Sequence, residues 1–170
     1  MSEKPTLFVV DDDPTSREAV RRLAESMATP AQEFESVEAF LDAYQGEAGC
    51  VVSDYRMAGM TGLELQEELT ARGHTLPVII VTSFASTSLT VRAIKSGAVT
   101  LLDKPYDDDD LWQAIRNAFA KDAELRERRV VESDVAQRLE SLTDKERQVL
   151  DRILAGKANK AMASELEVSL

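Results

Sequence analysis

Over residues 1–120, the chain switches repeatedly between two patterns of apolar and polar positions. Short, mostly apolar runs without helical spacing are typical of strands buried on both faces of a parallel sheet. Four such runs lie at residues 7–10, 50–53, 77–81 and 99–102, and a shorter strand is predicted near Gln32–Glu35. Because each of the four runs ends at polar residues, we expect polar side chains at the carboxyl ends of these strands.

Between these runs, apolar residues recur at the spacing of helices. Asp13-Pro14 predicts the start of the first helix, since it places a capping residue before a proline at the first helical position. Further helices are predicted after Ser36, at 62–71, from about Ser86 to Ser96, and from within Asp107–Asp110. The predicted apolar faces include Ala19, Val20, Leu23 and Met27 in the first helix, and Leu89, Ala93 and Ile94 in the fourth.

Strands that alternate with helices in this way predict an α/β fold. The buried character of the strands favours a flavodoxin-like, doubly wound five-stranded parallel sheet with the strand order 2-1-3-4-5. That order brings the carboxyl ends of strands one, three and four together, at the point where such sheets bind ligands.

The polar residues expected at this edge are acids, a hydroxyl and a lysine. They are Asp11, Asp12, Asp54, Thr82 and Lys104. Such a set suits one divalent cation and one phosphoryl group. Taken singly, each segment also has an ordinary interpretation, since the first acids can form a solvated turn with a helix cap and Lys104-Pro105 can form a turn.

The composition is that of an ordinary globular protein, with 44% hydrophobic and 30% charged residues among 170. No apolar stretch reaches membrane-spanning length, and no secretory signal is visible. The single Cys50 cannot form an internal disulfide and is interpreted as a core residue, which is consistent with a reducing cytoplasm. His74, alone in a loop, is expected to be solvated and without a role.

The net charge of −11 is unevenly spread along the chain. Residues 1–120 contain 10 basic and 20 acidic residues, whereas residues 121–170 contain 10 and 11. The first part should therefore repel the phosphates of nucleic acids, and the second part can tolerate them.

Residues 6–120 resemble the receiver domain of two-component response regulators. The matching segments are Val9 to Asp13, Asp54 to Gly62, Thr82 after its strand, and Lys104-Pro105-Tyr106. Each segment is a weak signal alone, but all four occur in order and at predicted strand ends. The resemblance implies a protein that is not an enzyme. It would accept a phosphoryl group from a sensor histidine kinase by self-catalysed transfer, lose it slowly, and thereby control a transcriptional output.

The resemblance also assigns roles to single residues. Asp54 is implied to be the phosphoryl acceptor, whose carboxylate attacks phosphorus and forms an acyl phosphate. Asp11, Asp12 and Asp54, together with the backbone carbonyl of Arg56, are the implied ligands of Mg²⁺.

Two further residues complete the implied site. Lys104 is implied to act as a point charge on the phosphoryl oxygens, and Thr82 to hydrogen-bond to the phosphoryl group and carry the switch. Two positions depart from the family pattern. Ala58 stands where the family usually has Pro, which leaves the loop after the acceptor less rigid, and Leu101 stands where many receivers carry Tyr or Phe.

Receivers of this type commonly form dimers through the fourth helix and fifth strand when they are phosphorylated. By helical and strand phase, Val91, Lys95 and Leu101 are the expected members of that face. We therefore expect a mostly monomeric resting state that shifts toward a homodimer.

The segment after residue 120 has a different character. Residues 121–138 lack Gly and Pro and are rich in Ala, Glu and Arg, which predicts an extension of the fifth helix or a helical linker. Leu125, Val131, Val135 and Leu139 give only a partial apolar stripe, which favours a solvated helix over a coiled coil.

Helices are also predicted in the last thirty or so residues. Thr143 and Glu146 form a predicted capping box, and Gly156 is expected to end the helix that follows. Asn159–Leu166 is predicted to form a second short helix, and Ser169 is a candidate cap for a third.

Residues 141–170 resemble the start of a LuxR-type helix-turn-helix, as found in NarL/FixJ-type regulators. The matching positions are Leu142 to Leu150, Gly156, Asn159, Lys160, Ala163, Leu166 and Ser169. The predicted organisation is a receiver domain at 1–121, a helical linker at 122–140, and an incomplete helix-turn-helix at 141–170. Because the recognition helix should begin after Ser169, we expect promoter DNA to be a partner of the full-length protein but not of this chain.

Two other functions fit parts of the same sequence. A phosphotransfer or interaction module without a DNA partner shares the receiver pattern, and the residues encoded after 170 would separate the two. A phosphohydrolase with an aspartyl nucleophile commonly carries a second acid two residues later, where this chain has Arg56. The acidic run Asp107–Asp110 is interpreted as charge at a helix N-terminus rather than as a metal site.

Overall fold

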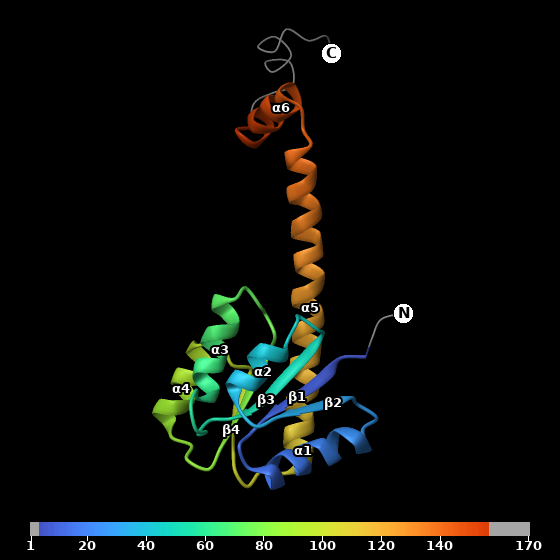
Figure 1. Ribbon diagram of the computed structural model, residues 1–170. Coiled ribbons are helices and arrows are strands. Elements are labelled where there is room, and N and C mark those ends of the chain that lie inside the picture. The colour runs from blue at the N-terminus through green and yellow to red at the C-terminus, as the bar shows by residue number, and fades with distance from the viewer. Residues whose placement is uncertain (1–3, 157–170) are drawn as a thin grey trace. The chain divides into compact units, whose positions relative to one another are not determined.

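The computed structural model describes residues 4–156. The chain divides into two compact units, residues 1–125 and 126–170. The first unit is built on five parallel strands in the order β2-β1-β3-β4-β5, which confirms the predicted sheet (Figure 1). The strands are β1 (Thr6–Val10), β2 (Ala31–Phe34), β3 (Gly49–Asp54), β4 (Val78–Thr82) and β5 (Thr100–Asp103). The helices are α1 (Pro14–Ser26), α2 (Val37–Ala43), α3 (Gly62–Ala71), α4 (Thr87–Lys95), α5 (Asp108–Glu140) and α6 (Asp144–Leu154).

Helices cover both faces of the sheet, because alternate residues of each strand point to opposite faces. Helices α2, α3 and α4 pack on one face, where their apolar residues join Phe8, Val51 and Ile80 of the strands. Helices α1 and α5 pack on the other face with Leu7 and Val52. Strands β1, β3 and β4 are therefore buried on both sides, which explains their nearly continuous apolar sequences. The edge strands β2 and β5 are only partly buried.

Strand β3 is held at its first residue by a side chain from α5. The backbone N–H of Gly49 donates a 2.9 Å hydrogen bond to Oδ2 of Asp122, and the Asp122 side chain is buried. The adjacent Cys50 is also buried, as predicted. Burial, together with the charge of Asp122, raises the pKa of the Cys50 thiol, so this thiol stays protonated.

Side-chain caps fix the helices at the predicted positions. Asp13 accepts hydrogen bonds from the backbone N–H groups of Thr15 and Ser16 at the start of α1. Ser36 and Ser86 cap α2 and α4 in the same way. Each of these caps lies at the end of the loop that follows β1, β2 or β4. The caps therefore fix the chain close to the edge of the sheet where strands β1 and β4 end.

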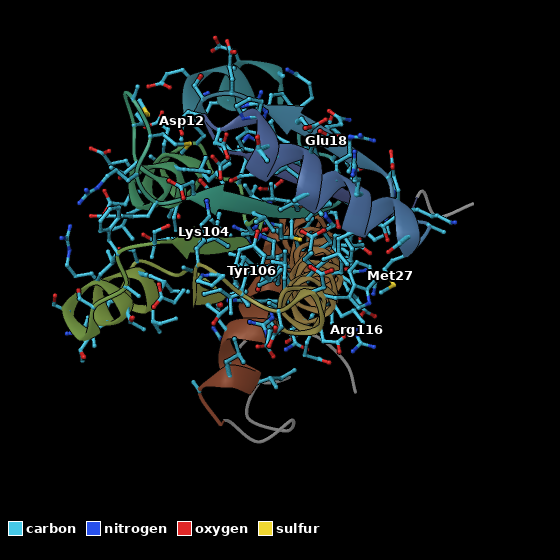
Figure 2. The ribbon with its side chains drawn as sticks, turned by 90° about the horizontal axis from the view of Figure 1, so that it is seen from below. Asp12, Glu18, Met27, Lys104, Tyr106 and Arg116 are labelled. Atoms are coloured by element: carbon cyan, nitrogen blue, oxygen red, sulfur yellow. The ribbon has the colours of Figure 1, made fainter. Side chains whose placement is uncertain are left out.

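Two predicted apolar faces were too wide. Ala19 is exposed, and Met27, the C-cap residue of α1, is 41% exposed (Figure 2). Ile94 of α4 is 48% exposed. The buried residues are Val20, Leu23 and Ala24 in α1, and Leu89 and Ala93 in α4. Ala19 and Ile94 each lie one position away from the buried stripe of their helix and so turn toward solvent. Met27 keeps the spacing of the stripe but lies at the C-cap, beyond the last residue of α1.

The sequence predicts a solvated His74, but in the structure this loop residue is half-buried. Its ring packs edge-on against the ring of Tyr44, with 5.0 Å between the ring centroids. Tyr44 is itself buried in the first apolar cluster. The contact joins the end of α2 to the loop before β4, and no local sequence pattern signals it.

The second unit contains the last part of α5 and α6. Because α5 runs without interruption from Asp108 to Glu140, the segment after residue 121 extends the fifth helix. The predicted capping box of Thr143 and Glu146 is present at the start of α6. The predicted helix Asn159–Leu166 and the cap Ser169 lie outside the described residues. Within residues 4–156, no helix has both the length and the apolar character needed to cross a membrane.

Candidate functional site

The predicted site residues lie where the central strands end. Asp54 is the last residue of β3 and Thr82 is the last residue of β4. Asp11 directly follows β1, and Lys104 directly follows β5. Asp11, Asp54 and Thr82 are buried, so these polar groups lie in an environment of low polarity, where their interactions with one another are strong.

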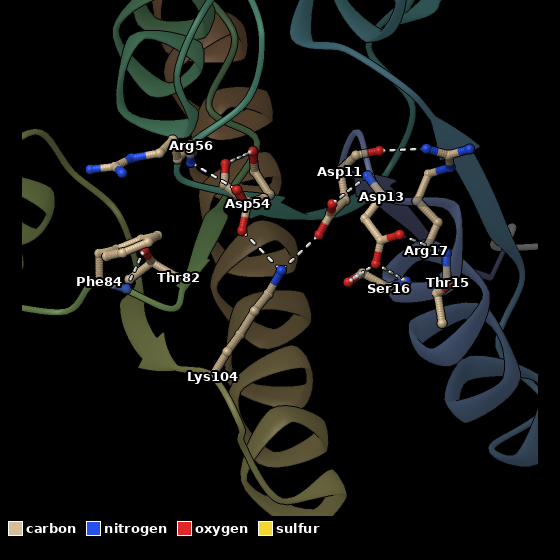
Figure 3. Close-up of polar contacts among 11 residues, drawn as sticks. Asp11, Asp13, Thr15, Ser16, Arg17, Asp54, Arg56, Thr82, Phe84 and Lys104 are labelled. Atoms are coloured by element: carbon tan, nitrogen blue, oxygen red, sulfur yellow. Dashed lines mark hydrogen bonds and ion pairs between the residues drawn. The ribbon is translucent and has the colours of Figure 1, made fainter.

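Lys104 brings two of the acids together. Its Nζ donates to Oδ2 of Asp11 and to Oδ1 of Asp54, at 2.9 Å each (Figure 3). Burial lowers the pKa of Lys104, but the hydrogen bonds and charges of the two carboxylates outweigh it and hold the pKa above its ordinary value. The lysine therefore remains charged and orients both carboxylates.

Backbone groups hold the other oxygen of each carboxylate. Oδ2 of Asp54 accepts a 2.8 Å hydrogen bond from the N–H of Arg56, and Oδ1 of Asp11 accepts a 2.9 Å bond from the N–H of Asp13. Each carboxylate is thus fixed by one backbone donor and by the shared lysine (Figure 3). Asp54 is held with a defined orientation at the end of its strand.

The cation-binding capacity of this edge follows from its charges. Asp11 and Asp54 carry two negative charges against the single positive charge of Lys104. Asp12 adds a third negative charge from an exposed position (Figure 2). Among residues 4–156, no three acidic, histidine or cysteine side chains converge as a complete metal-binding set. The donors nevertheless fit Mg²⁺, which commonly takes one or two carboxylates and completes its shell with waters.

Thr82 is linked to Lys104 through its backbone carbonyl, which accepts a 2.7 Å hydrogen bond from the Lys104 N–H, and not through its hydroxyl. Its Oγ1 accepts a 3.1 Å hydrogen bond from the N–H of Phe84. The exposed ring of Phe84 lies under the guanidinium of Arg56, 4.2 Å from Cζ to the ring centroid. This cation–π contact links the loop after β3 to the loop after β4. Sequence reasoning missed Phe84, because an aromatic residue in a loop carries no signal of its own.

The loop between β3 and α3 is closely fitted to Asp54. A Cβ at Gly62 would lie 2.6 Å from the backbone oxygen of Asp54 and 3.0 Å from Ser53 Oγ, so only glycine fits there. The N–H of Met60 donates a 3.0 Å hydrogen bond to Oε1 of Glu38 on α2. Glu38, which contacts this loop, is a second residue that the sequence pattern does not identify.

Family comparisons divide the chain in two. The family described as response regulator receiver domain matches residues 7–116. The family described as bacterial regulatory proteins, luxR family, matches residues 140–170.

Relatives resemble the chain along almost all of its length. Transcriptional regulatory protein FixJ of Bradyrhizobium diazoefficiens is 38% identical, over 99% of this chain and 83% of the relative. Transcriptional regulatory protein TdiR of Thauera aromatica is 35% identical, over 96% and 73%. Among solved structures, the response regulator StyR gives a TM-score of 0.85 at 39% identity, over 98% of this chain and 85% of the other. Full-length FixJ from B. japonicum gives 0.65 at 34% identity, over 99% and 83%.

The receiver match covers more than half of the chain, and these relatives align with nearly all of it. The chain therefore belongs to the response regulators, transcriptional regulators that combine a receiver domain with a DNA-binding domain of the luxR family.

Proposed function

We propose that Asp54 is the phosphoryl acceptor of this response regulator and that a sensor histidine kinase is the donor. A carboxylate oxygen of Asp54 forms a bond to phosphorus while the N–P bond of the kinase phosphohistidine breaks. The electron pair of that bond returns to the imidazole nitrogen, and the product is an aspartyl phosphate. The chain itself is a substrate that assists its own modification and not an enzyme acting on other molecules.

One observation carries this proposal. A buried carboxylate at the end of the central strand is held by a lysine that it shares with a second acid, Asp11. The lysine can exchange a carboxylate oxygen for a phosphoryl oxygen, and so it reduces the repulsion between the acid and an anionic donor. The resemblance of residues 54–62 to the receiver loop supports Asp54, rather than Asp11, as the acceptor.

Two other groups support the same reaction. Thr82 can donate its hydroxyl proton to a phosphoryl oxygen while it still accepts from Phe84, because a hydroxyl both donates and accepts. The carboxylates of Asp11, Asp12 and Asp54 and the backbone carbonyl of Arg56 would hold Mg²⁺, which would offset the negative charge of the site and of the phosphoryl group.

The proposed output is control of transcription. We assign the receiver domain to residues 1–121, a helical linker to 122–140, and a LuxR-type helix-turn-helix segment to 141–170. Promoter DNA is the proposed partner of this regulator, which would act in the cytoplasm. The two family matches support the first and last of these segments, and the first compact unit ends at residue 125, close to the proposed end of the receiver domain.

Phosphorylation is also proposed to favour a homodimer. Val91 and Lys95 lie exposed on α4, and Leu101 of β5 is half-buried beside the first apolar cluster. These residues are the candidates for the dimer face. Light scattering before and after phosphorylation should show a shift from monomer toward dimer, and an unchanged mass at about tens of micromolar protein argues against it.

Intact mass after incubation with a small phosphodonor tests the acceptor. We expect one phosphoryl adduct on the unaltered chain in the presence of Mg²⁺, none on Asp54→Asn, and almost none in excess chelator. An adduct that survives in Asp54→Asn places the acceptor elsewhere.

A further inference from the structure

The loop that follows the acceptor is contacted by Glu38, a residue that is not part of that loop. Glu38 lies in the first turn of α2, and its Oε1 accepts the Met60 N–H at 3.0 Å. The next amide, that of Thr61, donates at 2.7 Å to Oε2 of Glu64 on α3. Two consecutive amides of the loop are thus held by carboxylates from two different helices.

The contact with Glu64 has a local explanation, whereas the contact with Glu38 does not. Thr61 and Glu64 form the capping box that begins α3, which many helices have. Glu38 lies 22 residues before Met60 in the sequence, so no capping motif requires its contact with the loop. Its hydrogen bonds with its own backbone N–H and with that of Met60 lower the pKa of the Glu38 carboxyl, so it is ionised near neutral pH.

Gly59 is shaped to admit this carboxylate. Its φ of +88° is one that residues with a side chain rarely adopt. A Cβ at this position would lie 2.7 Å from Oε1 of Glu38. The backbone conformation and the absence of a side chain both allow the close approach, so the loop and Glu38 fit together as one unit.

The segment held in this way adjoins the acceptor. Arg56 donates its N–H to Asp54, and Met57 is buried in the first apolar cluster. Ala58 follows, and its backbone is free to adopt more conformations than a proline would allow. The hydrogen bond from Met60 to Glu38 restricts those conformations. The loop therefore loses less conformational entropy when a ligand fixes the Arg56 carbonyl.

We propose that Glu38 is a positioning residue for the acceptor site: it restrains the loop that carries the Arg56 carbonyl and thereby raises the affinity of the site for Mg²⁺. This role rests on the proposed function. Glu38 acts through the Met60 amide and touches neither the acceptor nor the phosphoryl group.

Three variants of the full chain separate this role from an effect of charge. Glu38→Ala removes both the acceptor of the hydrogen bond and the negative charge, whereas Glu38→Gln removes the charge but keeps an acceptor oxygen. Asp42→Ala removes the same charge from an exposed position one turn further along α2. Amide hydrogen exchange at Met60 reports the restraint, and calorimetric titration with Mg²⁺ reports the affinity.

We expect Glu38→Ala to accelerate exchange of the Met60 amide and to weaken Mg²⁺ binding by about fivefold, a factor that corresponds to the loss of one hydrogen bond of ordinary strength. Glu38→Gln and Asp42→Ala should stay within about twofold of the unaltered chain, because a neutral acceptor keeps most of such a bond. Exchange at Ile115, a buried residue of α5, should be unchanged in all three.

Several outcomes overturn the proposal. If the Glu38→Ala variant has the same Met60 amide exchange rate and the same Mg²⁺ affinity as the unaltered chain, Glu38 does not restrain the loop. Equal weakening by all three variants makes the effect one of charge alone. If the unaltered chain binds no Mg²⁺ and accepts no phosphoryl group, the proposed function fails, and this role of Glu38 fails with it. The exchange rate of the Met60 amide in Glu38→Ala still reports separately whether Glu38 restrains the loop.

Discussion

Helix α5 differs between its two parts. Up to Asp122 it buries side chains against the sheet: Leu111, Ala114, Ile115, Ala118 and Asp122. Beyond residue 125 its apolar residues are exposed, with Val130 at 61% and Val135 at 49%. The first part is stabilised by packing, whereas the second depends on the intrinsic helix preference of its Ala, Glu and Arg residues. The same secondary structure therefore tolerates substitution very differently along its length.

The largest contrast is expected between apolar truncations in the two parts. Ile115→Ala should lower the free energy of unfolding of the first unit by about 3 kcal/mol, because it leaves a cavity in a fully buried site. Val135→Ala should change it by less than about 0.5 kcal/mol. Urea unfolding followed by the fluorescence of Trp112, the single tryptophan, measures both. Similar losses would show that the second part is packed after all.

The next contrast concerns glycines at the two ends of α3. Gly62→Ala forces a Cβ to within 2.6 Å of the Asp54 backbone oxygen. It should destabilise the first unit by about 2 kcal/mol, as overpacking does. Gly73 has φ of +77° and no atom within 4 Å of an added Cβ. Gly73→Ala should cost about 1 kcal/mol from backbone strain alone. A larger loss at Gly73 in the same urea experiment would contradict the steric explanation.

The effect of pH should distinguish the site from its surroundings. The pKa of Lys104 is raised in the folded chain, so its contribution to stability is present in full below its unfolded pKa, about 10.4. That contribution is lost as the pH rises through the folded pKa. We therefore expect the unaltered chain to lose stability above about pH 10 more steeply than Lys104→Met. Parallel curves for the two proteins would mean that the lysine gains nothing from its carboxylate partners.

The smallest effect is expected in the second unit. Thr143→Ala removes the cap of α6 and should destabilise that helix by about 1 kcal/mol. Thr143→Ser keeps the capping hydroxyl and should be nearly neutral. Amide exchange within α6 measures the change, and the unfolding curve reported by Trp112 should stay the same. A shift of that curve would show that the two units unfold together.

Much of the fold and most of the site could be predicted because their signals are local. A buried apolar run marks a strand, and the polar residue that ends it marks the sheet edge, as at Asp54 and Thr82. Capping residues such as Asp13 and Thr143 act within a few positions of the helix start, so the sequence shows both partners.

The remainder depends on contacts between distant segments. The sequence places Asp11 and Lys104 at the same edge, but it does not show that one ammonium group holds two carboxylates. Glu38 and Phe84 contact the site region through side chains from neighbouring loops and helices, and neither has a local pattern. The outward position of Ile94 depends on how α4 is rotated against the sheet, which periodicity fixes only to within about one residue.

The hydrogen bond between Asp122 and Gly49 determines where this receiver can be cut when it is joined to another protein. Strand β3 begins at Gly49, where an added Cβ would lie 1.9 Å from the Thr6 carbonyl oxygen, and it ends at Asp54. A fragment cut at residue 121 loses the buried acceptor for the Gly49 N–H, although it keeps every residue of the site. Chimeras that join this receiver to another output domain should therefore cross over after residue 125, where the first compact unit ends.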